Sequence, residues 1–151
     1  ITSHSSVGLR VETWRIMLDT IKENPVFGIG IGGYKAERQR HIENKEVSEF
    51  VNQLPHSHNQ FLEIAVYSGL LGLALHLCIY ILPGIIFYQR IKDHTDRYLP
   101  LYTSGLIIIL GYLFFGLTDV TLSLKAHIMF FGLSIAILLT YSFKKKTPVE
   151  S

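Results

Sequence analysis

The stretch HSHN, residues 56–59, places two histidines one residue apart at the start of a long apolar run. A neutral imidazole, with a pKa near ~6.5, can take a proton from a weakly nucleophilic hydroxyl group at neutral pH. Alternatively, His56 and His58 could bind a metal ion, although no third Cys, Asp or Glu ligand lies at regular spacing. His58 could also be a polar residue at a helix start, without a chemical role.

A polar stretch before the histidines, residues 35–54, carries charges of both signs, including Arg38 and Arg40. A guanidinium group contacts phosphate or carboxylate oxygens at two points, so both arginines are candidates for binding an anionic ligand. The competing interpretation is the solvated face of a helix or loop.

Three apolar runs must position these side chains. Residues 64–88, 99–118 and 126–143 contain no Asp, Glu, Lys or Arg. A helix needs about 20 predominantly apolar residues to cross a bilayer, and its backbone satisfies its own hydrogen bonds there. We therefore expect an all-α membrane protein. Its residues 1–60 form an outer segment, and residues 61–151 form three transmembrane helices, about 61–88, 99–118 and 126–143, with a basic tail.

Basic side chains are concentrated after the first and third runs, whereas the link between the second and third runs carries only Lys125. Such an excess is typical of cytoplasmic loops, so residues 1–60 are expected on the opposite, periplasmic side. The net charge of +2 is then a topology signal and does not indicate nucleic-acid binding. The basic residues are Arg90, Lys92, Arg97 and residues 144–146.

The outer segment begins with an expected amphipathic helix that ends at Pro25. Its apolar stripe should lie on the membrane surface or on another helix, and it consists of Trp14, Met17, Leu18 and Ile21. The helix is followed by Gly28, Gly30 and Gly33 in the pattern Gly-x-Gly-x-x-Gly. This pattern binds dinucleotides only between a strand and a helix, so we expect a tight turn where backbone segments approach closely.

A continuous helix over residues 57–88 would place small residues on the same face as His58. Small side chains let another helix approach closely, so this face should point into a helix bundle, with His58 at its outer end. His76, deeper in the span, is expected to be neutral, hydrogen-bonded and structural. The face consists of His58, Ala65, Gly69, Gly72 and His76.

The order His58-Asn59, nine residues, Gly69, two residues and Gly72 resembles the signature of the O-antigen ligase and polymerase superfamily. That signature is His, then Asn, Ser or Gln, nine residues, and Gly-x-x-Gly, Thr or Tyr. The blocks GLRVETW and IKENPVFGIGIGGY precede it in the order typical of the family's periplasmic loop. The similarity is close over about residues 5–90 and extends to the last two spans only in pattern.

The resemblance implies a multi-span enzyme of the bacterial inner membrane that works on the periplasmic side. Such enzymes move a glycan from undecaprenyl diphosphate to a hydroxyl acceptor, without metal or cofactor, and attack opposite the diphosphate should invert the anomeric carbon. The first expectation is an O-antigen ligase that uses lipid A–core as acceptor. The alternatives are a polymerase of the same superfamily and, in a different class, a fragment of a transporter or a membrane scaffold.

The resemblance also implies roles for particular residues. His58 matches the family's essential histidine and is expected to be the catalytic base. Arg10 matches the arginine four residues before the tryptophan, here Trp14, and is expected to bind the diphosphate, the competing role being a cation at the membrane interface. Asn59 and Trp14 are candidates for substrate binding, although Asn59 could cap a helix and Trp14 could anchor in the interface. The family's other spans have no counterpart in these 151 residues, so we expect the C-terminal part of a longer protein, inactive by itself.

Overall fold

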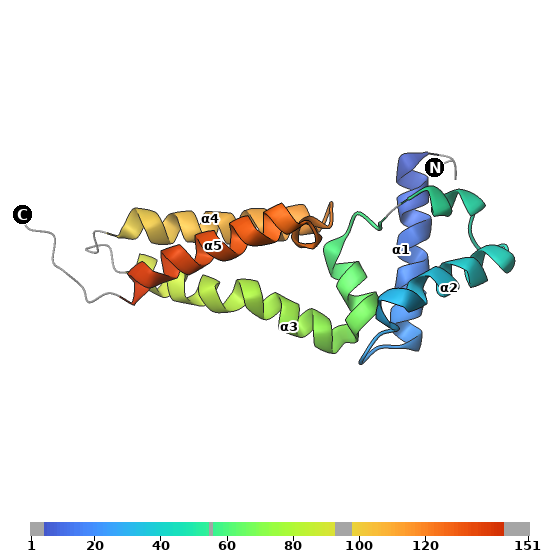
Figure 1. Cartoon of the computed structure of the whole chain (residues 1–151), viewed down its shortest axis with the longest axis horizontal. Coiled ribbons are helices and arrows are strands. Elements are labelled where there is room, and N and C mark those ends of the chain that lie inside the picture. The colour runs from blue at the N-terminus through green and yellow to red at the C-terminus, as the bar shows by residue number, and fades with distance from the viewer. Residues whose placement is uncertain (1–4, 55, 93–97, 144–151) are drawn as a thin grey trace, which may run out of the picture. The chain divides into compact units, whose positions relative to one another are not determined.

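The computed structural model describes residues 5–54, 56–92 and 98–143. Within these ranges the regular elements are all helical (Figure 1). Three of the helices are long and apolar enough to cross a membrane, which confirms the predicted all-α membrane fold. Arg97 and residues 144–146, on which the predicted orientation partly rests, lie outside the described residues. The helices are α1 (Ser6–Glu23), α2 (Gly30–Glu43), the 3₁₀ helix η1 (Glu49–Gln53), α3 (Gln60–Ile91), α4 (Leu99–Gly116), the 3₁₀ helix η2 (Thr121–Ser123) and α5 (Lys125–Ser142).

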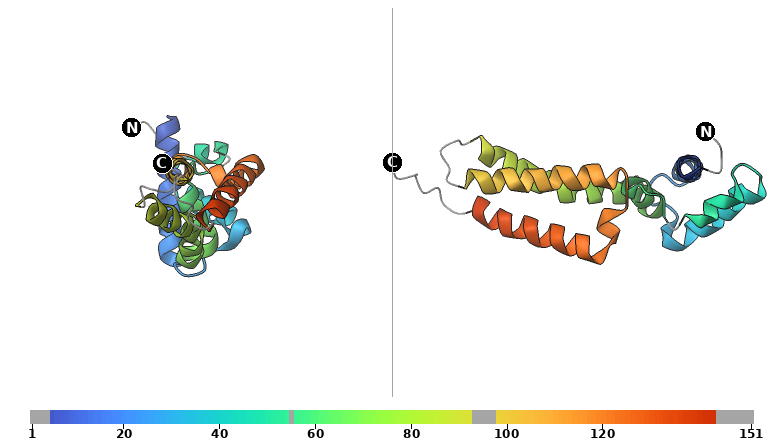
Figure 2. Two further views of the ribbon diagram at one scale, coloured as in Figure 1. Left: turned by 90° about the vertical axis from the view of Figure 1, so that its left-hand side faces the viewer. Right: turned by 90° about the horizontal axis from the view of Figure 1, so that it is seen from above.

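The chain divides into two compact units, residues 1–76 with 116–120 and residues 77–115 with 121–151. The second unit contains parts of α3, α4 and α5, which run side by side in Figures 1 and 2. Phe131 packs against Tyr80 and Tyr112, with ring centroids 5.4 Å and 4.9 Å apart. Aromatic contacts of this kind hold the three apolar helices together.

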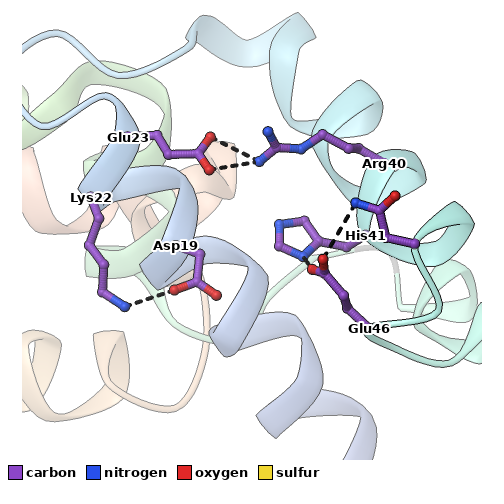
Figure 3. A pocket seen from close by; sticks show the side chains of 7 residues that line it. Asp19, Lys22, Glu23, Arg40, His41 and Glu46 are labelled. Carbon is purple, nitrogen blue, oxygen red and sulfur yellow. Dashed lines mark hydrogen bonds and ion pairs between the residues drawn. The ribbon is translucent and has the colours of Figure 1, made fainter.

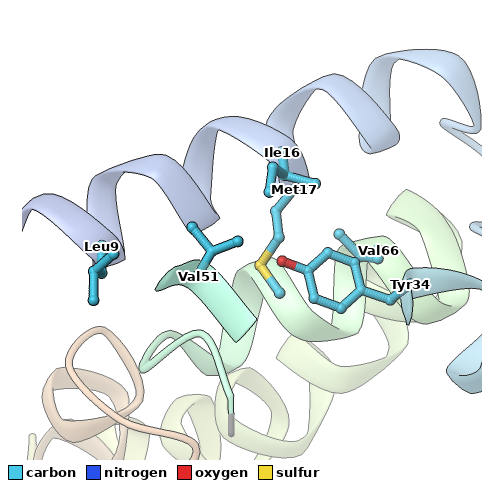
Figure 4. Packing of buried hydrophobic residues seen from close by; sticks show 6 residues of the cluster. All are labelled: Leu9, Ile16, Met17, Tyr34, Val51 and Val66. Atoms are coloured by element: carbon cyan, nitrogen blue, oxygen red, sulfur yellow. The ribbon is translucent and has the colours of Figure 1, made fainter. Parts of the chain in front are cut away.

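The core of the first unit is built on α1 (Figure 4). Ser5 caps this helix by accepting a 3.0 Å hydrogen bond from the Gly8 backbone N–H. Ile16 and Met17 are completely buried, whereas Leu18 is 48% exposed. Of the predicted stripe, Met17 thus packs against other elements of this unit, whereas Leu18 does not. The buried face of α1 also includes Thr13 and Thr20, which hydrophobicity alone does not reveal. The apolar core consists of Leu9, Ile16, Met17, Tyr34, Val51 and Val66.

Helix α3 is broken at Gly69, where φ is 67° and ψ is −173°. The expectation of one continuous helix from residue 57 was wrong. The N–H groups of Leu70 and Leu71, which follow the break, donate to the carbonyl oxygens of Pro25 and Val26, at 2.8 Å and 3.3 Å. The segment between α1 and α2 thus satisfies backbone groups that the break would leave without a helical partner.

The expected glycine-rich turn is confirmed, and it packs against this break. The Ile29 N–H donates to the Val66 carbonyl oxygen at 2.9 Å. A Cβ atom on Gly28 would lie 2.4 Å from the Val66 oxygen, and one on Gly69 would lie 2.0 Å from the Val26 oxygen. Both glycines also have positive φ, 66° and 67°, so the close approach depends on glycine at both positions.

Candidate functional site

The two histidines lie in a loop that precedes α3, and not on the helix face that the sequence predicted. His58 has φ 55°, in the left-handed region that non-glycine residues rarely adopt. Asn59 caps α3, since its Oδ1 accepts a 3.0 Å hydrogen bond from the Leu62 N–H. The capping alternative for Asn59 is thus the one that the geometry supports. We name residues 56–59 the histidine loop.

Ser57, which is buried, fixes the histidine loop to two helices. Its carbonyl oxygen accepts a 2.8 Å hydrogen bond from Trp14 Nε1 of α1. Its N–H donates to Glu63 Oε1 of α3 at 2.8 Å, and its hydroxyl donates to the Asn59 carbonyl oxygen at 2.9 Å. Surrounding contacts therefore hold His58 in its uncommon conformation, and the indole of Trp14 positions the loop.

Replacing Trp14 with phenylalanine is expected to loosen the histidine loop. The change removes the only indole donor and leaves the buried Ser57 carbonyl oxygen without this bond, a loss of about 1–3 kcal/mol. Hydrogen exchange at residues 57–59 should accelerate, and the unfolding free energy in detergent should fall. The exposed Arg15 on the same helix supplies the control, Arg15→Gln, which should change neither. Unaltered exchange in Trp14→Phe would contradict this role.

Asp119, which follows α4, lies beside the histidine loop in the first unit. Its Oδ1 lies 3.7 Å from His58 Nδ1 and 3.8 Å from His56 Nδ1. Asn59 Nδ2 also donates to the Leu117 carbonyl oxygen at 3.4 Å, which connects the two chain segments. A carboxylate at this position stabilises a positive charge on either ring. Neither periodicity nor motif spacing relates Asp119 to residue 58, so the sequence predicted no role for it in this site.

Arg10 contributes positive charge to the environment of His58. The pKa of His58 lies below its ordinary value of 6.5, first because the ring is partly buried and then because of the charges of His56 and Arg10. Asp119 and Glu63 act in the opposite direction. The ring is therefore mainly neutral at neutral pH, the state that accepts a proton. Arg10 Nε is buried and has no hydrogen-bond partner in the described part of the chain.

The titration of His58 gives a test of this electrostatic arrangement. With 13C-labelled histidine, the His58 resonance should have a midpoint below 6.5, so more than half of the rings are neutral at that pH. His56→Gln removes one neighbouring positive charge and should move the midpoint upward. The resonance is identified by its absence in His58→Asn. A midpoint above 6.5, or a downward shift in His56→Gln, would contradict the arrangement.

Arg38 is bound to the backbone of its own unit. Its Nη1 donates to the carbonyl oxygens of Val51 and Leu54, both at 3.3 Å. Its guanidinium carbon lies 5.1 Å from the centroid of the Tyr34 ring. Through these contacts Arg38 connects α2 with the segment around η1. Its contact with substrate stays a prediction.

Arg40 lies in a polar pocket of about 330 Å³, shown in Figure 3. It pairs with Glu23 at 2.8 Å and with Glu37 at 2.7 Å. In the same pocket Lys22 pairs with Asp19, and the buried His41 pairs with Glu46. The carboxylates of the pocket lining balance its two cations, Lys22 and Arg40, so the pocket lacks the positive excess that an anionic substrate needs. A substrate contact of Arg40 therefore also stays a prediction.

His76 has the structural surroundings that the sequence predicted. Its Nε2 accepts a 2.7 Å hydrogen bond from Gln60 Nε2, because an amide NH2 group can only donate. The Phe61 ring packs against it, with centroids 6.3 Å apart. His76 thus supports the first segment of α3, directly after the histidine loop.

Comparison with known proteins decides the family. The sequence model of the O-antigen ligase family matches residues 2–77, which is half of the chain and contains Arg10, Trp14, the histidine loop and the break at Gly69. The chain belongs to the O-antigen ligase family. Asp119 lies beyond the matched residues, so its place beside His58 in this O-antigen ligase family member comes from the structure alone.

Two relatives of this O-antigen ligase family member show similar identity. An uncharacterized protein of Haemophilus influenzae is 30% identical over 112 residues, 74% of this chain and 28% of that protein. A Rickettsia bellii protein named "Putative polysaccharide ligase" is 30% identical over 82 residues, 51% of this chain and 19% of that protein. The chain thus spans about a quarter and about a fifth of the lengths of these relatives.

Proposed function

We propose that the protein takes part in transferring a glycan from undecaprenyl diphosphate to a sugar hydroxyl of lipid A–core. Membership of the O-antigen ligase family supports a ligase-like role, as does the polysaccharide ligase relative named above. The observation that carries the proposal is the arrangement of His58: a mainly neutral imidazole, 3.7 Å from the carboxylate of Asp119 and within the electrostatic influence of Arg10.

In the proposed reaction, His58 accepts the proton of the acceptor hydroxyl while the hydroxyl oxygen attacks the anomeric carbon of the donor glycan. A new carbon–oxygen bond forms as the bond to the diphosphate breaks, and the configuration inverts. Asp119 stabilises the imidazolium that results. Arg10 stabilises the negative charge that develops on the departing undecaprenyl diphosphate. The donor carries its own activation, so no cofactor is required by this scheme.

The proposed site lies on the periplasmic side of the inner membrane. Arg90 lies in the last turn of α3 and Lys92 follows this helix, whereas Lys125 is the one lysine or arginine from the end of α4 through the first turn of α5. This distribution supports a cytoplasmic location for the end of α3. Asp119 and the histidine loop then lie on the periplasmic side, where a lipid-linked glycan and a lipid A–core acceptor can meet.

Complementation of a ligase-deficient strain tests the function. The full-length protein that contains this chain should restore ligated lipopolysaccharide, and Arg10→Ala should reduce it by at least about tenfold, because a charge-assisted contact with the diphosphate contributes about 1.5–3 kcal/mol. Arg15→Ala, on the exposed side of the same helix, is the matched control and should retain full ligation. The amount is measured from lipopolysaccharide separated on gels, with protein abundance determined in parallel.

A polymerase-deficient strain distinguishes the two transferase activities. Rescue of that strain alone would contradict the ligase proposal and favour polymerisation. Full ligation by Arg10→Ala would instead contradict the role of Arg10 while leaving the ligase activity itself supported.

A further inference from the structure

A second chemical property of the histidine loop follows from the group formed by His56, His58 and Asp119. Their ligand atoms all lie within 4.8 Å of one another. Both imidazoles direct the same nitrogen, Nδ1, toward one oxygen, Asp119 Oδ1, at 3.8 Å and 3.7 Å. The sequence offered two histidines without a third ligand, and the structure supplies the carboxylate.

The spacing of these atoms suits a shared ion better than direct hydrogen bonds. Nitrogen–oxygen hydrogen bonds are about 2.7–3.2 Å long, so 3.7 Å and 3.8 Å are too long. Ligands at about 2.0–2.1 Å from a tetrahedral zinc ion are separated from one another by about 3.3 Å. The two separations between histidine nitrogen and carboxylate oxygen exceed this value by about 0.5 Å, and the group as a whole, within 4.8 Å, would have to contract by up to about 1.5 Å around the ion.

His56 Nδ1 provides a second, independent observation. This nitrogen is buried, and no hydrogen-bond partner for it exists among the described residues. A buried polar atom without a partner costs free energy, and a bound cation would remove that cost. Nothing in the proposed transfer reaction uses His56.

The surrounding structure holds the three ligands in place before any ion binds. The bonds of Ser57 to Trp14 and Glu63 fix the loop between the two histidines. Asp119 Oδ1 accepts a 2.8 Å hydrogen bond from the Val120 N–H, which orients the carboxylate. The Asp119 side chain is 52% exposed, so water can complete the coordination and the ion can enter from solvent.

The donor set and the nearby charges define the class of ion. Two imidazole nitrogens and one carboxylate oxygen suit zinc and similar transition metals, whereas magnesium and calcium prefer oxygen ligands. The negative charge of Glu63 favours a cation and the positive charge of Arg10 opposes it. A reversible site is therefore expected, and not a permanent structural one.

We propose that His56, His58 and Asp119 bind a divalent transition-metal ion of the zinc class, and that this ion switches off His58. The ion binds the electron pair of Nδ1 of the neutral His58 ring, so the single N–H hydrogen of the ring resides on Nε2. Nε2 then has no free electron pair for a hydroxyl proton. The inhibitory part of this proposal rests on the proposed function, whereas the binding part does not.

Cobalt binding tests the site directly. The protein, purified in detergent without a histidine tag, is titrated with Co²⁺, whose tetrahedral complexes absorb strongly in the visible range, and Zn²⁺ is then added as competitor. One ion per chain should bind. His56→Gln and Asp119→Asn should each weaken binding at least about tenfold, in line with the loss of a metal contact. His127→Gln, a histidine of α5 outside the group, is the control and should bind as the wild type does. Unchanged affinity in both test variants, or a weak octahedral spectrum only, would overturn the site.

Zinc inhibition of glycan transfer tests the second part. Transfer by the wild type should fall as Zn²⁺ is added and recover with a chelator. In His56→Gln, half-inhibition relative to its own zinc-free rate should need at least about ten times more Zn²⁺. Binding without inhibition overturns the switch and leaves the site and the proposed function standing. Complete absence of transfer without zinc overturns the proposed function together with the switch, while the cobalt spectrum still decides whether the site exists.

Discussion

Replacement of His58 with asparagine is expected to reduce glycan transfer about 10²–10⁴-fold, the contribution typical of a general base. Asparagine removes the imidazole that takes the hydroxyl proton but tolerates positive φ better than most residues. It therefore suits the backbone at residue 58, where φ is 55°. A loss of activity then reports on the missing base and not on a rearranged loop. The measurement is the initial rate of transfer from an undecaprenyl diphosphate-linked glycan, with the full-length protein in membranes.

Two further variants make the result specific. His127→Asn, in α5 and outside the histidine loop, should retain the wild-type rate. Asp119→Asn should slow transfer by a smaller factor, because it removes only the charge that stabilises the imidazolium. Since the two residues act on the same proton transfer, the double variant should be no slower than His58→Asn alone. A rate for His58→Asn within about threefold of wild type would remove His58 from the mechanism.

The positions that sequence analysis located are those marked by local patterns. Three charge-free runs predicted the membrane helices, because an apolar stretch of that length has few other stable conformations in lipid. His58, Asn59 and Arg10 were found through short blocks of fixed spacing. Their proposed chemical roles are still predictions, whereas the structure now shows the capping bond of Asn59 and the position of His58 beside Asp119.

The features that sequence analysis missed depend on contacts between distant segments. Asp119 lies in the short link after α4 and resembles any exposed acidic residue until the fold places it beside the histidines. Trp14 fitted an interfacial anchor equally well, because a donor for the Ser57 carbonyl oxygen leaves no mark in the sequence. The sequence also contained no sign of the partners of Arg38 and Arg40, which are Val51, Leu54, Glu23 and Glu37.

The break in α3 could not be predicted from the sequence for a related reason. Apolar residues continue on both sides of Gly69, so hydrophobic periodicity indicates an uninterrupted helix. Glycine in an apolar span also suggests close packing between helices, which was the interpretation chosen from the sequence. The actual reason for glycine is a backbone conformation stabilised by the turn at Gly28, and only the three-dimensional contact shows it.

Replacement of Gly69 with alanine is accordingly expected to lower the unfolding free energy by about 2–6 kcal/mol. The backbone at φ 67° and ψ −173° is accessible almost only to glycine, and forcing another residue into it costs about 1–3 kcal/mol. The added Cβ atom would also lie 2.0 Å from the Val26 carbonyl oxygen, and overpacking of this kind costs about 1–3 kcal/mol more. Unfolding in detergent, followed by helical circular dichroism, gives the measurement.

The matched control is Gly32→Ala, which is not expected to lower the unfolding free energy. Gly32 lies within α2, and a Cβ atom there would meet no heavy atom of the described residues within 4 Å. Alanine is favoured over glycine inside a helix by about 0.5–1 kcal/mol, so Gly32→Ala should leave stability unchanged or raise it slightly. Gly69→Ala should also accelerate hydrogen exchange at the N–H groups of Ile29, Leu70 and Leu71, which form the hydrogen bonds between the turn and α3. Equal stability of the two variants would show that α3 can be continuous, and the turn would then have no part in holding the segment that carries the histidine loop.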